Sequence, residues 1–463
     1  GLALRVRREG AHWVQTLKGS GDDALTRFEH NVRVYASAAG GPPPADPALH
    51  RGTAVGDRLL ALLGHEGAAT LNVRYRTDVL RRTRTLRSGG ATIELAFDSG
   101  TIRAGDDASW PLCELELELA NAQGDAGDPA ALIELGRTWA RRHHLWLDTR
   151  SKSERGELLA RGTRIAPART AQKVVLTREM SPHAAWRAVL RECVGHIAAN
   201  ASQIASGEHG DEHVHQLRVA LRRLRTAGQL FDFMPSDPAQ LEAAAALFRG
   251  LGVARDQAVA GVAFSDDLER AFERLGVPRG LGDAKPTSAA PGGREAADPC
   301  TLVRAQATQM LLLGLIAASM EPDAAIDAGL DEEPLAERLA RRIKRWHKRA
   351  AADALRFAEL DDTQRHRLRK HVKRLRYAVE FSAGLFERGQ VKRYLKPLRA
   401  LQEQLGTISD VIVAMHALPG TPDRQVHDWF ALGWLSARRD ALVQQAAAPL
   451  QAFAKVQGFW RAR

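Results

Sequence analysis

The sequence has few of the residues that mark a disulfide-stabilised, metal-thiolate or membrane-spanning protein. Its 463 residues include only three cysteines, Cys113, Cys193 and Cys300, which lie far apart and show no metal-ligand spacing. This usage fits a reducing compartment, so we expect a cytoplasmic protein. No run of about 18 apolar residues occurs, and the sequence therefore predicts no membrane-spanning helix.

Positive charge is concentrated in the larger, C-terminal part of the chain. Residues 1–162 contain 22 Lys or Arg and 21 Asp or Glu, a net charge of +1. The formal net charge of the whole chain is +11, so the remainder carries +10. Such an excess suggests an anionic partner. The length predicts two or three domains of about 100–200 residues each.

Residues 1–162 show the period-2 alternation of antiparallel strands, separated by Gly- and Pro-rich turn signals. Strands are expected at 4–7, 14–18, 27–34, 73–84, 92–98 and 112–119, with a helix at 128–144 and a last strand near Lys152. The alternation places Glu114, Glu116 and Glu118 on one face of their strand. Three like carboxylates in a row need cations or a divalent metal beside them. This pattern favours a closed barrel with a charged interior over a sheet whose charged face is solvated.

These strands resemble the CYTH family of triphosphate tunnel enzymes. The resemblance is carried by residues 1–7, 13–18, 27–29, 93–98, 113–119 and 151–156. It implies an eight-stranded antiparallel tunnel that binds a triphosphate and hydrolyses it with Mg²⁺ or Mn²⁺. The implied phosphate ligands are Arg5, Arg7, Lys18, Arg27, Arg82, Arg84 and Arg103, where strand parity selects Arg82 and Arg84 rather than Arg81. The implied catalytic residues are Glu29, Glu94, Glu114, Glu116 and Lys152, and the implied metal ligands are Glu114, Glu116 and Glu118.

The first strand of the family pattern is not found in this sequence. The family opens with an E-x-E-x-K strand, and nothing before Leu4 matches it. Either this strand precedes Gly1 in a longer chain, or the protein lacks it. The sequence does not begin with methionine, which favours the first alternative and hence an active enzyme. The second alternative implies a degenerate tunnel that binds phosphates without cleaving them.

A helical period replaces the strand period after a polar linker at 163–178, and a short basic helix occurs there twice. Residues 215–225 read HQLRVALRRLR and residues 366–376 read HRLRKHVKRLR. At about 100° per residue, the histidine and three cations of each copy share one face, opposite three apolar residues. Each copy is followed by L-G-x-x-x-D, at 251–256 and at 405–410. This repetition indicates an internal duplication of a helical unit.

The doubled motifs resemble the CHAD domain, an α-helical module that binds inorganic polyphosphate. The resemblance runs from about residue 180 to the C-terminus and implies one continuous basic groove between two helical halves. The implied polyphosphate ligands are His215, Arg218, Arg222, Arg223, Arg225, His366, Arg369, Lys370, Lys373 and Arg376. Nucleic acid is the rival polyanion, but few aromatic residues for base stacking accompany these basic stretches. A further basic cluster at 341–349 fits either a solvated face or an anion site.

The sequence therefore predicts an α+β multidomain protein resembling a CYTH–CHAD fusion. The expected domains are an antiparallel β-barrel at 1–162 and an all-α duplicated helical bundle at 179–463, with repeats at about 179–280 and 300–463. The expected function is a metal-dependent triphosphatase with tripolyphosphate as substrate and polyphosphate as partner, held in the cytoplasm or on polyphosphate granules. The alternative is a non-catalytic polyphosphate-binding protein that targets such granules. The sequence leaves monomer and dimer open.

Overall fold

The computed structural model of the chain forms two compact units. The first comprises residues 1–136 and 148–167, and the second comprises residues 137–147 and 168–463. The structure describes residues 2–20, 27–36, 41–64, 71–120, 128–235, 237–262, 265–276, 297–321, 333–418, 422 and 424–460. Each unit has buried hydrophobic clusters of its own.

The first unit contains a small antiparallel sheet formed by β1 (Leu2–Glu9), β2 (His12–Ser20) and β3 (Arg27–Val34) in that order. The 3₁₀ helix η1 (Pro47–His50) and the helix α1 (Ala54–Leu63) lie against this sheet. Gly19 of β2 makes that close approach possible, because a Cβ atom there would lie 2.7 Å from a methyl carbon of Val55. The helices η1 and α1 therefore lie on one face of the sheet, and the charged side chains lie on the other.

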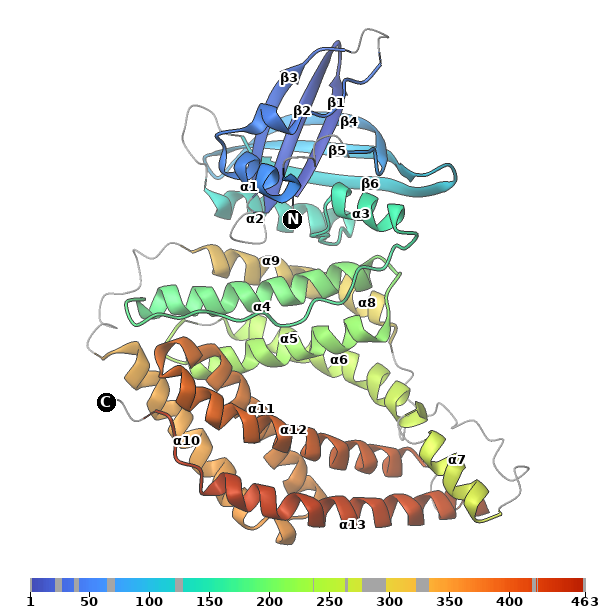
Figure 1. Cartoon of the computed structure of the whole chain (residues 1–463), viewed down its shortest axis with the longest axis vertical. Coiled ribbons are helices and arrows are strands. Elements are labelled where there is room, and N and C mark those ends of the chain that lie inside the picture. The colour runs from blue at the N-terminus through green and yellow to red at the C-terminus, as the bar shows by residue number, and fades with distance from the viewer. Residues whose placement is uncertain are drawn as a thin grey trace. The chain divides into compact units, whose positions relative to one another are not determined.

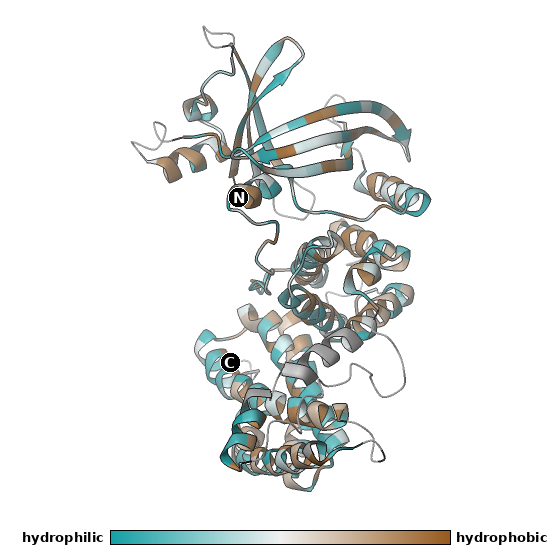
Figure 2. Ribbon diagram, turned by 90° about the vertical axis from the view of Figure 1, so that its right-hand side faces the viewer, coloured by the Kyte–Doolittle hydropathy of each residue, from teal (hydrophilic) through white to brown (hydrophobic). Residues whose placement is uncertain are grey.

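A second antiparallel sheet is formed by β4 (Arg76–Ser88), β5 (Ala91–Ala104) and β6 (Ala108–Leu119), and its strands cross those of the first sheet (Figure 1). Teal and brown segments alternate along the strands, as the period of two predicts (Figure 2). The helix α2 (Pro129–His143) packs on one face, where Ala131 contacts Ala91 and Ile93. The helix α3 (Lys152–Ala160) packs on the other face, where Leu159 contacts Ile102 and Leu112.

One prediction for this unit needs correction. The expected strand near Lys152 is wrong, because residues 152–160 form α3. The Ser151 side chain caps the backbone N–H of Glu154 while the Glu154 carboxylate accepts from the Ser151 backbone, a capping box that favours a helix start. The six strands of the described residues form two three-stranded sheets, and no closed ring of eight strands is seen among them.

The described elements of the second unit are all helices, as predicted, and none of them is long and apolar enough to cross a membrane. Its first half contains α4 (Pro182–Ala205), α5 (Asp211–Leu230), α6 (Pro238–Val262) and α7 (Ser265–Arg274), followed by α8 (Pro299–Arg304) and α9 (Gln306–Met320). The repeat boundary expected at about 300 assigned α8 and α9 to the second repeat, whereas in the structure they pack on α4 and α6 of the first. Its second half contains α10 (Leu335–Leu355), η5 (Phe357–Glu359), α11 (Asp362–Ser382), η6 (Ala383–Leu385), α12 (Arg388–Ala417) and α13 (Val426–Ala454).

The duplication expected from the motifs is visible in the order of these helices. In each half a long helix packs on a basic helix, which packs on the helix that carries the L-G motif: α4, α5 and α6, then α10, α11 and α12. The two basic helices, α5 and α11, also pack on each other. Their apolar backs are buried as predicted, since Leu217, Leu221 and Leu224 are at most 4% exposed and Leu368, Val372 and Leu375 are fully buried.

Candidate functional site

The face of the first sheet opposite η1 and α1 carries charged and polar side chains. Arg5 pairs in register with Thr16, and Thr16 with Asn31. Two residues farther along β2, Lys18 is opposite Glu29 in the register and forms a 2.6 Å ion pair with it. The register also places Arg7 and Arg27 on this face; the side chain of Arg27 lies outside the described residues.

The second sheet brings a charged cluster to one face together with α3. Asp98 is fully buried and accepts two hydrogen bonds from the Arg81 guanidinium, at 2.7 and 2.6 Å. The Lys152 ammonium lies 2.7 Å from a carboxylate oxygen of Asp98 and 2.5 Å from one of Glu116, and it also pairs with Glu114. We define the charged cluster as Asp98, Glu114 and Glu116 with Arg81, Lys152 and Arg155.

The electrostatics of the cluster show how strongly its members interact. Burial raises the pKa of Glu116, but the charges and hydrogen bonds of Lys152 and Arg81 outweigh it and hold the pKa below its usual value. Burial also raises the pKa of Asp98, but the hydrogen bonds and charges of Arg81 and Lys152 outweigh it, so this pKa is lowered as well. Burial lowers the pKa of Lys152, but Glu116 and the other carboxylates reverse this and raise it. All three carboxylates are therefore matched by cations.

Arg5 links the two sheets. Burial and then the like charge of Arg7 lower the pKa of Arg5, and Arg81 and Glu116 of the second sheet also act on it. The buried Nε atoms of Arg5 and Arg7 have no hydrogen-bond partner among the described residues. Donors in this state suit a site that receives an anion, because a buried unsatisfied donor costs about 1–3 kcal/mol.

Several residues expected at this site lie elsewhere. Arg82 pairs in register with Phe97 and Arg84 with Leu95, so both point to the face opposite Asp98. Arg103 shares that opposite face, since it lies an odd number of residues from Asp98 on the same strand. The parity prediction was wrong by one residue, and Arg81 takes the place expected for Arg82 and Arg84.

The predicted glutamates of the second sheet separate into two groups. Glu114 and Glu116 belong to the charged cluster. Glu94 and Glu118 are opposite each other in the strand register, farther along the same face and outside the cluster. Asp98, Arg81 and Arg155 were missed in the site assigned from the sequence. Asp98 could have been found there, because it shares the parity of Glu94.

Three carboxylates of the cluster could hold a divalent metal ion. One oxygen each of Asp98, Glu114 and Glu116 lies within 4.8 Å of the others. Carboxylate oxygens are the ligands that Mg²⁺ and Mn²⁺ prefer, so the donor set fits such an ion. Glu118, the third metal ligand expected from the sequence, is not part of this group among the described residues.

The second unit places the repeated cationic residues of α5 and α11 on a shared surface. We call this the basic face: His215, Arg218 and Arg222 of α5 with His366, Arg369, Lys370 and Lys373 of α11. Burial lowers the pKa of His366, and the charges of Lys370, Arg369, Lys373 and Arg222 lower it further. Because Arg222 comes from the other repeat, the two helices present their cations together.

Three further predicted ligands have different surroundings. Arg223 is 4% exposed and pairs with Glu192 at 3.1 Å and Glu380 at 3.5 Å, so it belongs to the core between the two halves and not to the basic face. Arg376 donates to Gln402 at 2.5 Å and pairs with Glu380 at 2.8 Å. Arg225 is exposed and lies near Arg374 rather than near His366.

The L-G motifs pack beside the basic helices in both halves. Arg218 donates a 2.9 Å hydrogen bond to the Leu251 carbonyl oxygen. A Cβ atom at Gly252 would lie 3.1 Å from the Arg218 guanidinium, so glycine leaves room for that approach. In the second half, Arg369 lies 3.8 Å from Asp410. The side chain of Asp256, the matching residue of the first half, lies outside the described residues.

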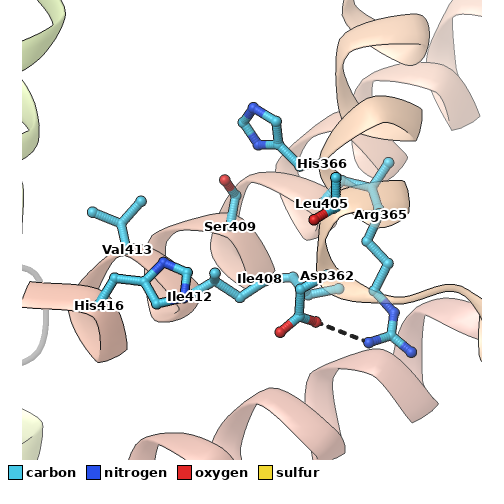
Figure 3. Close-up of a pocket in the computed structure, with 10 residues that line it drawn as sticks. Asp362, Arg365, His366, Leu405, Ile408, Ser409, Ile412, Val413 and His416 are labelled. Atoms are coloured by element: carbon cyan, nitrogen blue, oxygen red, sulfur yellow. Dashed lines mark hydrogen bonds and ion pairs between the residues drawn. The ribbon is translucent and has the colours of Figure 1, made fainter.

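A mostly apolar pocket of about 280 Å³ opens between α11 and α12 next to the basic face. It is lined by Leu405, Ile408 and Ser409 of α12, which carries the second L-G motif, together with His366 of α11. Figure 3 shows the His366 imidazole above the Ser409 hydroxyl, and Asp362 turned toward Arg365.

These features define a duplicated all-helical domain with a cationic surface shared by its two repeats. The family model of the CHAD domain matches residues 188–419, which is half of the chain, and the chain therefore belongs to the CHAD domain family. It is also similar to the crystal structure of the CHAD domain from the plant Ricinus communis. The identity is 30%, the match covers 62% of this chain and 97% of that chain, and the TM-score is 0.48.

Proposed function

We propose that the protein binds inorganic polyphosphate through the basic face of α5 and α11. The observation that carries the proposal is the repeated cationic helix, because His366 is held among cations from both repeats. Like charges brought together in this way repel one another, and a polyanion relieves that repulsion. A linear chain of phosphates can contact cations of both helices at once, and this binding would hold the protein on polyphosphate granules.

Two single variants of α11, each of which replaces one arginine by alanine, test this function. Arg369 lies on the basic face, whereas Arg367 is exposed two residues earlier, about 160° around the helix. We expect Arg369→Ala to weaken binding of long-chain polyphosphate by about tenfold, the usual effect of losing a charged hydrogen bond. Arg367→Ala should weaken it less than about threefold. Equal effects of the two variants would argue against the basic face.

The partner can be separated from nucleic acid by competition. Binding should weaken steeply with salt for any polyelectrolyte, so salt dependence alone does not identify the polyanion. We expect unlabelled long-chain polyphosphate to displace bound polyphosphate at far lower concentration than single-stranded DNA of equal charge. Equal displacement by the two polymers would make nucleic acid the better candidate.

We propose for the first unit a second activity, the metal-dependent hydrolysis of a triphosphate. Its support is the charged cluster together with Arg5, Arg7 and Lys18 on the facing sheet. Asp98, Glu114 and Glu116 would hold Mg²⁺ or Mn²⁺, which when bound polarises a phosphoryl oxygen. The cations would grip the phosphate oxygens and stabilise the charge that develops on them.

A matched pair of variants on β6 tests this activity. Glu116→Gln changes the charged cluster, and Glu118→Gln removes the same charge from the same face outside it. We expect release of phosphate from tripolyphosphate with Mg²⁺ or Mn²⁺, loss of at least about 100-fold in Glu116→Gln, and near-normal release in Glu118→Gln. If the unchanged protein releases no phosphate with either metal but still binds polyphosphate, the protein is the non-catalytic binder.

A further inference from the structure

A second concentration of arginines lies on α10. Arg338, Arg342, Arg345 and Arg349 follow one another at intervals of four, three and four residues, so they line one side of the helix. Arg341 lies beside them. We call these five residues the arginine stripe. The sequence left open whether the basic residues of this helix are only solvated, because they occur all round it.

The structure shows that part of the stripe lines a pocket. The pocket has a volume of about 270 Å³ and is lined by Leu230, Asp232, Phe233, Arg338, Arg341, Arg342 and Arg345. The Arg338 guanidinium lies 4.7 Å from the centre of the Phe233 ring. Arg342 donates a 2.8 Å hydrogen bond to the Gln229 carbonyl oxygen and pairs with Asp232. These contacts hold the guanidinium groups in place before any ligand arrives.

The charges around the pocket are unequal. Four arginines line it, and the carboxylates that pair with them in the described residues are Asp232 with Arg342, and Glu333 with Arg338 and Arg341. Glu333 itself is not among the lining residues. An anion that enters the pocket would therefore meet an excess of positive charge.

Arg374 of α11 extends this charge toward the centre of the helical unit. Burial lowers the pKa of Arg374, and the neighbouring charges of Arg349, Arg225 and Arg342 lower it further. Its guanidinium lies 4.4 Å from the centre of the Trp346 ring, and its hydrogen bond is to the Gln229 side-chain oxygen at 3.5 Å.

The corresponding arginine of the other repeat has different partners. Arg223 occupies the position of the repeat that corresponds to Arg374, and it is neutralised by the carboxylates of Glu192 and Glu380. The residue that corresponds to Glu380 is Gln229, an uncharged amide. One repeat thus neutralises Arg223 with two carboxylates, whereas no carboxylate pairs with Arg374 in the part of the chain that the structure describes.

We propose that the pocket on α10 is a second phosphate-binding site, separate from the basic face, which takes a short stretch of inorganic polyphosphate. A guanidinium group can bind a phosphate group through two parallel N–H···O hydrogen bonds. Several arginines that converge on one pocket therefore suit a compact oligophosphate better than a single bulky anion. The pocket is lined by residues of α10 and of the segment 230–233, and none of its lining residues belongs to the basic face. The class of ligand rests on the proposed polyphosphate binding; the location of the site does not.

Two double variants of α10 in the full-length protein test the site. Arg341→Ala/Arg345→Ala removes two cations that line the pocket. Lys344→Ala/Lys348→Ala removes two exposed cations of the same helix, at the same spacing, that do not line it. With EDTA present to prevent hydrolysis, we expect the arginine pair to lose at least about tenfold in affinity for long-chain polyphosphate. We expect the lysine pair to lose less than about threefold.

A site-resolved measurement on the unchanged protein guards against variants that misfold. Tripolyphosphate should slow the modification of Arg341 and Arg345 by phenylglyoxal about tenfold and leave the exposed Arg356 unchanged, as read by peptide mass spectrometry. Equal loss of affinity in the two double variants, or no protection of Arg341 and Arg345, overturns the second site. If the unchanged protein and Arg369→Ala bind polyphosphate equally weakly, the proposed function fails instead.

Discussion

Replacement of Arg223 by alanine should destabilise the helical unit without weakening polyphosphate binding. The motif groups Arg223 with the other cations of α5, but the structure buries it against α4 and α11. Its guanidinium pairs with Glu192 and Glu380 and stacks at 4.6 Å on the Phe381 ring. Its neighbour in sequence, Arg222, lies on the basic face and is the natural control.

The size of the effect follows from what each carboxylate retains. Glu380 keeps Arg376 at 2.8 Å and Arg399 at 3.2 Å, so it remains paired. Glu192, whose side chain is 8% exposed, keeps a hydrogen bond from the Gln172 backbone but loses the arginine that pairs with it. Breaking a buried pair by removing one partner costs about 3–5 kcal/mol. Because one of the two carboxylates stays neutralised, we expect about 3 kcal/mol, a fall of roughly 6 °C in the melting temperature.

The assay combines two measurements on each variant. Thermal unfolding followed by the helical circular dichroism signal reports stability, and titration with long-chain polyphosphate below the melting temperature reports affinity. Arg223→Ala should melt lower and bind normally, whereas Arg222→Ala should melt normally and bind about tenfold more weakly. The reasoning is refuted if Arg223→Ala melts like the unchanged protein and loses as much affinity as Arg222→Ala.

Two further predictions concern pH. The lowered pKa values of Asp98 and Glu116 mean that these carboxylates stabilise the first unit above the usual carboxyl range, and that this stability is lost as the pH falls through the lowered values. Melting at pH 7 and pH 3 should show this loss, and Lys152→Met should make it smaller; a pH dependence unchanged in Lys152→Met would contradict the role of the ammonium. The pKa of His366 lies below 6.5 in the free protein, and a bound polyanion should raise it. Polyphosphate affinity should therefore increase as the pH falls from 8 to 6, by up to tenfold for each unit that the pKa rises, and His366→Gln should flatten this dependence. A flat profile for the unchanged protein would show that His366 takes up no proton on binding.

Much of the local structure could be read from the residues. The strands, the helices and the buried leucines of α5 and α11 follow from periods of 2 and 3.6, which depend only on neighbouring residues. The error at residues 151–160 came from assigning a strand by resemblance where a Ser-x-x-Glu capping box was present. The error at Arg81 arose because a shift of one residue moves every side chain of a strand to the opposite face.

The sequence by itself determined which residues repeat, which faces are apolar and where positive charge accumulates, because each of these is a property of spacing along the chain. Only the tertiary structure decided which charges are already neutralised. It buries Arg223 between two carboxylates and leaves Arg374 beside an amide. It also brings Asp98 to Glu114 and Glu116 from different strands and places Lys152 among them. Electrostatic interaction depends on distance in space and on burial, and neither quantity is contained in the order of the residues.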